Sequence, residues 1–401
     1  MKGIIALLIL LMSVSCGIVE IGGADEDEIY PPAWVSPSYG GGTPQDRHVC
    51  YITALDYPEG YDWISDRETG TVKCSLVVFA GGKPVMKVPV GEEYLVSGEP
   101  DMHRVVGGHL YTDYSTDSQT VFKCDAEEVF RYDGCEMICD MAIRDGDIYT
   151  LGQRRDGNGF SFRRNGEVLL ERHRGYVFGR IQHIGDSLCF AFSEPVESAE
   201  GRVERYYHVI DGKVSQVALR EDIRYVWDIV MHEGKVHLLA RLVGINAPVL
   251  VAGEEVSVLK LSGGAAVSSC RFLPSEKDLF MEGTVSFSAG TETSLLWRKT
   301  EIYQSFYGMT VSAMCSWGDG ICCLLPPSSA SAKTGIFRCG DVFESPEGYL
   351  PVGTSPLAMV DGILHVGLSS LAGKPPVVWM DGQLDTLDVN GYICTVNSVL
   401  P

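Results

Sequence analysis

The segment Trp227-Asp-Ile-Val-Met-His-Glu-Gly-Lys-Val-His-Leu-Leu-Ala240 determines the fold class of this chain. Apolar and polar residues alternate on both sides of a Glu-Gly pair, a pattern typical of two strands joined by a tight turn. The Glu-Gly pair suits such a turn, because the central positions of a two-residue hairpin loop need positive φ angles. The segment therefore predicts a β-hairpin.

The same hairpin recurs along the chain. Clear copies are Cys139-Asp-Met-Ala-Ile-Arg-Asp-Gly-Asp-Ile-Tyr-Thr-Leu-Gly152 and Leu357-Ala-Met-Val-Asp-Gly-Ile-Leu-His-Val-Gly367. Each is followed by a second hairpin, such as Tyr206-Tyr-His-Val-Ile-Asp-Gly-Lys-Val-Ser-Gln-Val217. Four antiparallel strands in a repeat of roughly 40–45 residues are the blade of a β-propeller. We therefore predict an all-β fold, a β-propeller of four-stranded antiparallel blades.

The spacing of the repeats indicates the number of blades. First strands are expected near Met102, Met137, Phe178, Val226, Val267, Thr310 and Ser355. Three N-terminal strands (48–57, 71–80 and 83–90) and one C-terminal strand, Tyr392–Val396, remain. The C-terminal strand would complete the first blade and close the ring. Eight blades give ~44 residues each and seven give ~51, so eight is favoured and seven is kept as the alternative.

The N-terminus has the pattern of an export signal. Residues 1–15, MKGIIALLILLMSVS, contain one Lys and then a run of about ten apolar residues, whereas a membrane-spanning helix needs ~20. The next segment, 16–47, combines an acidic run with Pro and Gly and cannot bury enough surface to fold. We predict a signal peptide over 1–15, a tether over 16–47 and one propeller domain over 48–401.

Residues 48–400 resemble β-propellers in general and, together with the N-terminus, the exported β-propeller lipoproteins of Bacteroides-like bacteria. Cys16 after Ser-Val-Ser resembles the lipobox of bacterial lipoproteins, although Ser13 stands where that family usually has Leu. The resemblance implies that Cys16 is lipidated and that the lipid is the chain's one membrane contact. It implies that the protein is anchored to the outer membrane in the cell envelope of a Gram-negative bacterium. Both the periplasmic side and the surface side of that membrane remain alternatives. A plain secretory signal is the alternative.

Charge and cysteine usage narrow the partners and cofactors. The formal charge of −21 becomes −22 once residues 1–15, which contain only Lys2 as a charge, are removed. Nucleic acid would repel such a chain and is excluded as a partner. Most cysteines other than Cys16 lie in apolar runs, so we expect mostly buried free thiols. A few disulfide bridges remain the alternative. No CxxC pair has a second pair or a His partner, so we predict no metal and no cofactor.

Two acids recur at one position of the repeat, Asp140 and Asp228, at the start of a first strand. They could present carboxylates around the central channel, for cation binding or acid–base chemistry. The structural interpretation is favoured, in which each caps backbone amides of the preceding turn, because one residue type at one repeat position indicates a requirement of the blade.

The ligand face is expected where the last strand of one blade connects to the first strand of the next. These connections lie near 132–138, 173–179, 221–227, 262–267, 305–310 and 349–355. They carry aromatic or arginine residues suited to sugars, peptides or carboxylates: Tyr176, Arg180, Arg224, Tyr225, Trp227 and Tyr307. The alternative is that these aromatic rings pack between blades.

The sequence contains no nucleophile elbow, P-loop, dinucleotide fingerprint or zinc-protease motif. We therefore favour a membrane-anchored, monomeric binding or interaction module for a glycan, a peptide or an envelope protein over an enzyme, and predict no catalytic residue. The alternative is a carbohydrate-active enzyme, a glycosidase or lyase, with carboxylates from several blades in the funnel.

Overall fold

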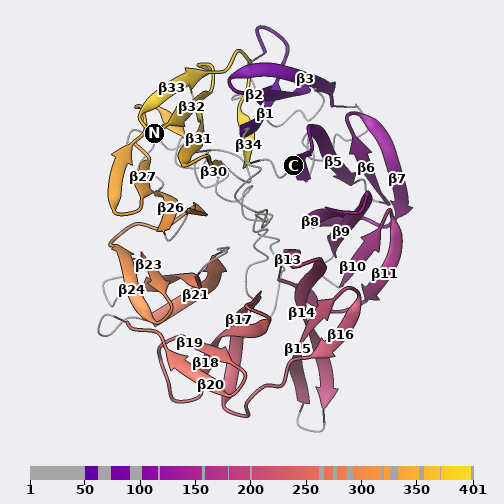
Figure 1. Ribbon diagram of the computed structural model, residues 1–401, viewed down its shortest axis with the longest axis vertical. Helices are drawn as coiled ribbons and strands as arrows, with labels where there is room; N and C mark the ends of the chain where they lie inside the picture. Colours follow the sequence, from indigo (N-terminus) through magenta and orange to yellow (C-terminus); the bar gives the residue numbers. More distant parts are fainter. Residues whose placement is uncertain are drawn as a thin grey trace. The chain divides into compact units, whose positions relative to one another are not determined.

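The computed structural model describes residues 50–61, 74–90, 102–115, 118–155, 159–178, 180–198, 201–261, 266–273, 278–286, 292–317, 320–325, 333–351, 356–370 and 372–398. Strands β1 to β34 of these residues form eight antiparallel sheets, each built on a core of four strands (Figure 1). The fold is an eight-bladed β-propeller, which confirms the predicted class and favours eight blades over seven. The predicted signal peptide and tether, 1–47, lie outside the described residues.

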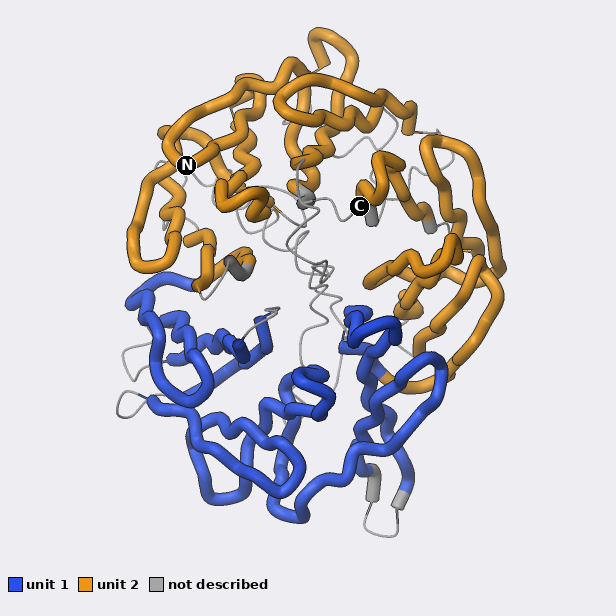
Figure 2. The backbone as a smooth tube through the Cα atoms, viewed as in Figure 1, with its two compact units in different colours: residues 1–36, 176–274, 278–310 blue, residues 37–175, 275–277, 311–401 orange. Residues whose placement is uncertain are grey.

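The chain divides into two compact units, shown in Figure 2. The described part of the first unit runs from Tyr176 to Thr310, and that of the second unit covers the residues on either side. The three sheets of the first unit are β12 (Tyr176–Val177), β13 (Gln182–Ile184), β14 (Ser187–Ser198), β15 (Gly201–Ile210) and β16 (Lys213–Gln216); β17 (Ile223–His232), β18 (Lys235–Leu242), β19 (Val249–Ala252) and β20 (Glu255–Val258); and β21 (Ala266–Leu273), β22 (Phe280–Ser286), β23 (Glu292–Arg298) and β24 (Glu301–Phe306).

The second unit contains the other five sheets. Their strands are β34 (Ile393–Ser398), β1 (Cys50–Asp56), β2 (Ser75–Ala80) and β3 (Lys83–Pro89); β4 (Met102–Val106), β5 (His109–Ser115), β6 (Gln119–Cys124) and β7 (Glu127–Asp133); β8 (Glu136–Arg144), β9 (Asp147–Arg154), β10 (Phe160–Arg164) and β11 (Glu167–Arg172); β25 (Ala313–Trp317), β26 (Gly320–Leu325), β27 (Gly335–Arg338) and β28 (Asp341–Glu344); and β29 (Tyr349–Leu350), β30 (Leu357–Val360), β31 (Ile363–Ser370), β32 (Val377–Met380) and β33 (Gln383–Thr386).

The first sheet joins the two ends of the chain, as predicted. Strand β34 pairs antiparallel with β1, and the two lie side by side in Figure 1. Thr53 and Thr395 face each other across this pair, and their hydroxyl oxygens are 2.7 Å apart. The backbone N–H of Leu55 also donates to the carbonyl of Tyr392 at 2.9 Å. The C-terminal strand therefore completes the N-terminal blade.

The predicted hairpin turns have the expected backbone. Glu233 and Gly234, between β17 and β18, have φ angles of 50° and 72°, and Asp145 and Gly146 have 55° and 82°. Two positive φ angles in a row give the two-residue loop whose twist matches the flanking strands.

Two predicted first strands are interrupted. The strand expected from Phe178 consists of β12 and β13, which both pair with β14, and the strand expected near Ser355 likewise consists of β29 and β30. In the first case the break holds Arg180, whose buried side chain reaches into the neighbouring sheets. The backbone leaves the pairing there because a buried guanidinium needs hydrogen-bond acceptors that its own strand does not offer.

The hydrophobic core lies between neighbouring sheets of each unit. In the first unit, Val230 and Leu239 from one sheet pack with Phe272, Met281 and Trp297 from the next. In the second unit, Leu55 and Leu76 pack with side chains of β4 to β6. A strand that is covered on both faces can be almost wholly apolar, as in Ile321–Leu325 of β26, which is buried along its whole length.

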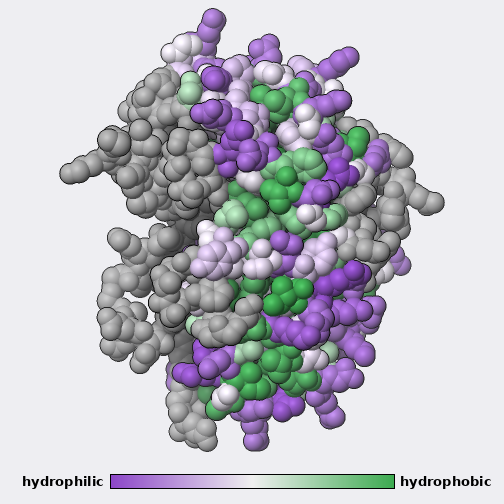
Figure 3. Space-filling view, turned by 90° about the vertical axis from the view of Figure 1, so that its left-hand side faces the viewer, coloured by the Kyte–Doolittle hydropathy of each residue, from purple (hydrophilic) through white to green (hydrophobic). Residues whose placement is uncertain are grey.

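The outermost strands carry a recurring irregularity. In three blades of the second unit an extra residue bulges from the outer strand, and it is an exposed apolar residue: Val85, Val129 or Leu169. On the face drawn in Figure 3, which is the left-hand side of Figure 1 and does not include β7 and β11, apolar side chains are also interspersed among hydrophilic ones. A bulge bends an edge strand and hinders pairing with another chain, which allows apolar residues to remain exposed there.

Within the described residues, no helix has the length and apolar character that crossing a membrane requires.

Candidate functional site

All the predicted ligand residues with described positions belong to the first unit. Tyr176 is partly buried in β12, and Arg180 is buried between β12 and β13. Strand β17 carries the exposed Arg224 and the partly buried Tyr225 and Trp227. Tyr307, in the turn after β24, is 68% exposed. Cys16 lies outside the described residues.

Strand β17 presents its candidate residues through two β-bulges. Its pairing with β18 shifts between Ile223 and Tyr225 and again between Val226 and Asp228. Arg224 and Trp227 are therefore the extra residues of the two bulges. A bulge turns a side chain away from the normal alternation of the strand, and bulges are frequent beside binding sites. The sequence pattern placed both residues near the strand start but gave no sign of the bulges.

Tyr225 and Trp227 form an edge-to-face aromatic pair, with ring centroids 5.5 Å apart and planes at 82°. Trp227 also packs against the core between its own sheet and the next, beside Val230 and Leu239. Burial raises the pKa of Tyr225 to about 12, with a further contribution from the Glu204 carboxylate. The Tyr225 hydroxyl is therefore a neutral hydrogen-bonding group at physiological pH, and the pair is fixed on one side by the core.

A buried ion pair involves the residue next to this aromatic pair in the chain. The Arg180 guanidinium bonds to Oδ2 of Asp228, the residue that follows Trp227, and both side chains are almost fully buried. The same carboxylate accepts the backbone N–H of Ile229 at 2.8 Å and, from the next sheet, that of Phe272 at 2.8 Å. Arg180 is thus committed to a structural contact, whereas the sequence placed it on the ligand face.

The structure brings Tyr225 and Trp227 together on β17, with the exposed Arg224 next to Tyr225 in the strand. Trp227 packs toward the β21–β24 sheet, whereas Arg180 reaches Asp228 of β17 from the β12–β16 sheet. Tyr176 pairs across the sheet with Ser193. Tyr307 begins a turn at the end of the third sheet, in which Met309 N–H donates to the Phe306 carbonyl. The candidate site is therefore the group of Arg224, Tyr225 and Trp227, called here the β17 aromatic site.

The second unit has a counterpart of the Arg180 contact. Asp140 of β8 is 3.1 Å from Arg104 of β4, and its Oδ1 accepts the N–H of Met141 at 2.7 Å. Asp140 and Asp228 both make structural contacts, but the predicted cap on the preceding turn is wrong. Each carboxylate caps the amide of the residue after it rather than an amide of the preceding turn, because the bulge before it turns that N–H toward the side chain.

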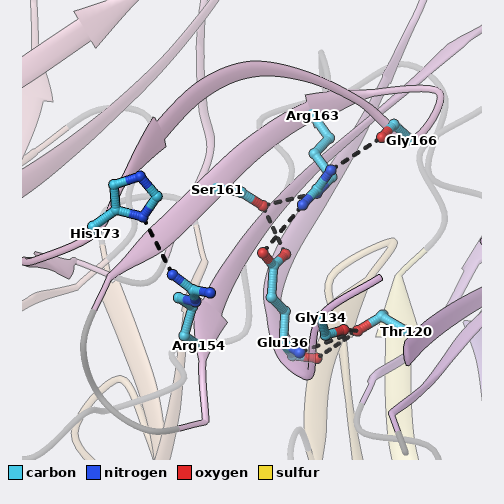
Figure 4. A network of polar contacts seen from close by, with 8 residues as sticks. All are labelled: Thr120, Gly134, Glu136, Arg154, Ser161, Arg163, Gly166 and His173. Carbon is cyan, nitrogen blue, oxygen red and sulfur yellow. Dashed lines mark hydrogen bonds and ion pairs between the residues drawn. The ribbon is translucent and has the colours of Figure 1, made fainter. Parts of the chain in front are cut away.

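Other buried carboxylates are also engaged with cations. Glu136 lies opposite Arg163, with 3.3 Å between Oε1 and the guanidinium, and the Ser161 hydroxyl donates to its Oε2 at 2.6 Å. Figure 4 shows both side chains pointing at the Glu136 carboxylate. In the first unit, Arg271 and Ser294 bond to Glu282 in a similar arrangement. These acids hold the strands of their own sheets together.

Comparison with protein-family models and with curated proteins finds no match. Similar solved structures include the dihydro-heme d1 dehydrogenase NirN in complex with DHE, at 9% identity and a TM-score of 0.51, covering 94% of this chain and 83% of that one. Another is the β-propeller domain of the Trilobed protease from Pyrococcus furiosus, at 11% identity and a TM-score of 0.45, covering 77% and 96%. An acylaminoacyl peptidase complex has 11% identity and a TM-score of 0.45, covering 83% and 58%.

At these identities the likeness extends to the fold alone. A fold by itself assigns no activity.

Proposed function

We propose that this protein is a binding module that takes a glycan, a peptide or a protein partner at the β17 aromatic site. The observation that carries the proposal is the edge-to-face pair of Tyr225 and Trp227, fixed by the core and flanked by the exposed Arg224. Rigid aromatic side chains lose little conformational entropy on binding, and their faces suit sugar rings and apolar side chains. The guanidinium adds a bidentate partner for a carboxylate.

The ion pair behind the site supports this interpretation. Arg180 and Asp228 neutralise each other and join neighbouring sheets. Because Asp228 follows Trp227 in β17, these contacts fix the backbone next to Trp227. A pre-organised surface binds more tightly, since less order is lost when the ligand arrives. Strand β17 therefore has the construction expected of a binding surface.

The alternative, a carbohydrate-active enzyme, would need a pair of carboxyl groups free to act on a substrate. Of the five buried acids among the described residues, four instead face a guanidinium group: Asp140, Asp228, Glu136 and Glu282 face Arg104, Arg180, Arg163 and Arg271. The fifth, Asp113, accepts the backbone N–H of Ile138 at 3.4 Å. These contacts favour a structural role for the acids and a binding function for the protein.

A glycan array combined with a pull-down from native membranes tests the proposal. Arg224→Ala and Tyr225→Ala should reduce the signal of any ligand found. Arg131→Ala, which removes a partly exposed arginine of β7 in the second unit, is the matched control and should leave it unchanged. Equal binding by all variants would show that the ligand sits elsewhere, and release of a cleaved glycan would establish the enzyme.

We also propose that a lipid on Cys16 anchors the propeller to the outer membrane of a Gram-negative cell envelope. Support comes from the short apolar segment before Cys16 and the acidic, Pro/Gly-rich segment after it. The mature protein should partition into detergent, and mass spectrometry should find a lipidated Cys16. Cys16→Ala should release the protein from membranes; retention of that variant would contradict the anchor. Protease treatment of intact cells distinguishes the surface side from the periplasmic side.

A further inference from the structure

A cluster of three potential metal ligands lies on the β4–β7 sheet of the second unit, apart from the β17 aromatic site. His109 begins β5, Cys124 ends β6, and Asp125 follows it in the turn to β7. One imidazole nitrogen of His109, the Sγ of Cys124 and one carboxylate oxygen of Asp125 all lie within 4.8 Å of one another. The sequence predicted no metal, because His109 and Cys124 are far apart in the chain and fit no spacing motif.

The backbone fixes the position of these residues. Cys124 pairs with Tyr111 across β5 and β6, which brings the end of β6 against the start of β5. Asp125 has a φ of 52°, and its N–H donates to the Leu110 carbonyl at 2.8 Å. The Leu110 N–H in turn donates to Oδ1 of Asp125 at 2.7 Å. That leaves Oδ2, which lies 2.6 Å from Nδ1 of His109. The carboxylate is therefore oriented by the backbone before any ligand binds.

The donor set and its spacing suit a divalent transition metal. Zinc takes nitrogen, sulfur and carboxylate ligands at ~2.0–2.3 Å, so tetrahedral ligand atoms lie ~3.3–3.6 Å apart. Atoms already within 4.8 Å reach that spacing by small side-chain rotations. The Nδ1–Oδ2 contact of 2.6 Å is a hydrogen bond, which the ion would replace. The ring proton of the neutral imidazole would then sit on Nε2, and the thiol would release its proton to solvent.

A hydrogen bond between His109 and Asp125 would by itself explain two of the three residues. The Cys124 thiol has a hydrogen bond with Tyr111 and packs beside the apolar cluster of Tyr111 and Phe122, and from there it adds a soft ligand atom next to the other two residues. The side chains of His109 and Asp125 are 60% and 31% exposed, so the cluster is open to solvent. Three protein ligands with solvent access leave a fourth position for water or an external ligand.

We propose that His109, Cys124 and Asp125 form a three-ligand binding site for zinc(II) or a similar divalent transition metal. The ion ties the β4–β5 turn to the β6–β7 turn. This site is independent of the β17 aromatic site and needs no particular function of the propeller.

The test is titration of the reduced, chelator-treated full-length protein with Co²⁺, followed by displacement with Zn²⁺. The wild-type protein should bind one equivalent and develop the charge-transfer absorption of a cobalt–thiolate bond, which Zn²⁺ should remove. Cys124→Ser should abolish that absorption. His109→Gln and Asp125→Asn should weaken binding by more than ~10-fold. Asn tolerates a positive φ and can keep the bond to Leu110, so Asp125→Asn should fold normally.

Cys339→Ser is the matched control. Cys339 is an exposed turn cysteine of the same unit, with a φ of 48°, and lies outside the cluster. The Cys339→Ser variant should bind Co²⁺ like the wild type. The proposal is wrong if no stoichiometric binding occurs, if folded Cys124→Ser keeps the thiolate absorption, or if Cys339→Ser loses it. Thermal melts of each apo variant show which of them are folded.

Discussion

Asp228 joins three sheets of the first unit through a single carboxylate. It bonds to the guanidinium of Arg180 from the preceding sheet, accepts the N–H of Ile229 in its own strand, and accepts the N–H of Phe272 from the following sheet. Arg180 also donates to the Phe272 carbonyl at 3.4 Å. The pair is buried, so each charge depends on the other for compensation.

Asp228→Ala should therefore lower the free energy of unfolding by ~3–5 kcal/mol, because Arg180 would remain buried without its anion. Replacing both residues by leucine and methionine should cost less than the single change. The control is Asp222→Ala, which removes an exposed pair with Arg220 and should leave the melting temperature unchanged. Denaturant unfolding measures the difference, and equal stability of Asp228→Ala and wild type would show that the pair is dispensable.

The joining of the chain ends can be tested at Gly391. A Cβ at this position would lie 2.1 Å from the backbone oxygen of Leu55 in β1, so the two strands would have to move apart. Gly391→Ala should cost ~1–3 kcal/mol, whereas Asp388→Ala, at an exposed position nearby, should be neutral. Deleting residues 391–401 removes β34 altogether and should prevent cooperative folding. A truncated protein that melts near the full-length midpoint would mean that β34 is not needed.

The cysteines provide a chemical test of burial. All twelve from Cys50 to Cys394 are free, and burial raises the pKa of both Cys50 and Cys139 to about 12. These thiols therefore stay protonated and unreactive near about pH 8, since the thiolate is the nucleophile. Burial and the neighbouring Cys322 also raise the pKa of Cys339, to about 11, so its solvent exposure and not a low pKa distinguishes it. Ellman's reagent should therefore modify Cys339 first in the native protein and all twelve after denaturation without reductant. Cys339→Ser should remove the fast phase, and five or six disulfides found by mass spectrometry would refute the prediction.

Acid should destabilise the protein through three partly buried histidines. Burial lowers the pKa of His208, His237 and His365 below the ordinary value of 6.5. The unfolded chain takes up these protons near pH 6.5 and the folded chain only at lower pH, so stability is full above 6.5 and falls as the pH drops below it. Melting temperatures from about pH 8 to about pH 5 should show this fall. His365→Gln should reduce the slope, while His183→Gln, at an exposed position of β13, should not.

The sequence predicted the repeat and the turns because these depend on local patterns, and the joining of the ends followed from counting the strands left outside the repeats. Alternating residues and an Asp-Gly or Glu-Gly pair determine each hairpin wherever it occurs, and Glu233 and Gly234 have the predicted positive φ angles. The break at Arg180 could not be predicted this way. It arises from a contact with Asp228, 48 positions away in the chain, and local pattern contains no information on such contacts.

The candidate site was likewise predictable in its residue types and not in its long-range contacts. The residue types of the ligand face were visible in the sequence, but the bulges that place Arg224 and Trp227 depend on the pairing of β17 with β18. The cluster of His109, Cys124 and Asp125 was missed for a related reason. Its members meet only because β5 and β6 are paired, so neither Cys124 nor His109 has a partner at motif spacing.

Trp227 gives the sharpest test of the β17 aromatic site, because it contacts the core on one side and is partly exposed on the other. Its natural comparison is Trp297 of the same core cluster, which is fully buried. Trp297→Ala should cost ~3–5 kcal/mol, the loss expected for a large buried aromatic side chain. Trp227→Ala should cost clearly less and should reduce ligand binding, and Trp227→Phe should restore most of the stability. If the alanine variants of the two tryptophans lose equal stability, Trp227 is a core residue and the proposed site loses its anchor.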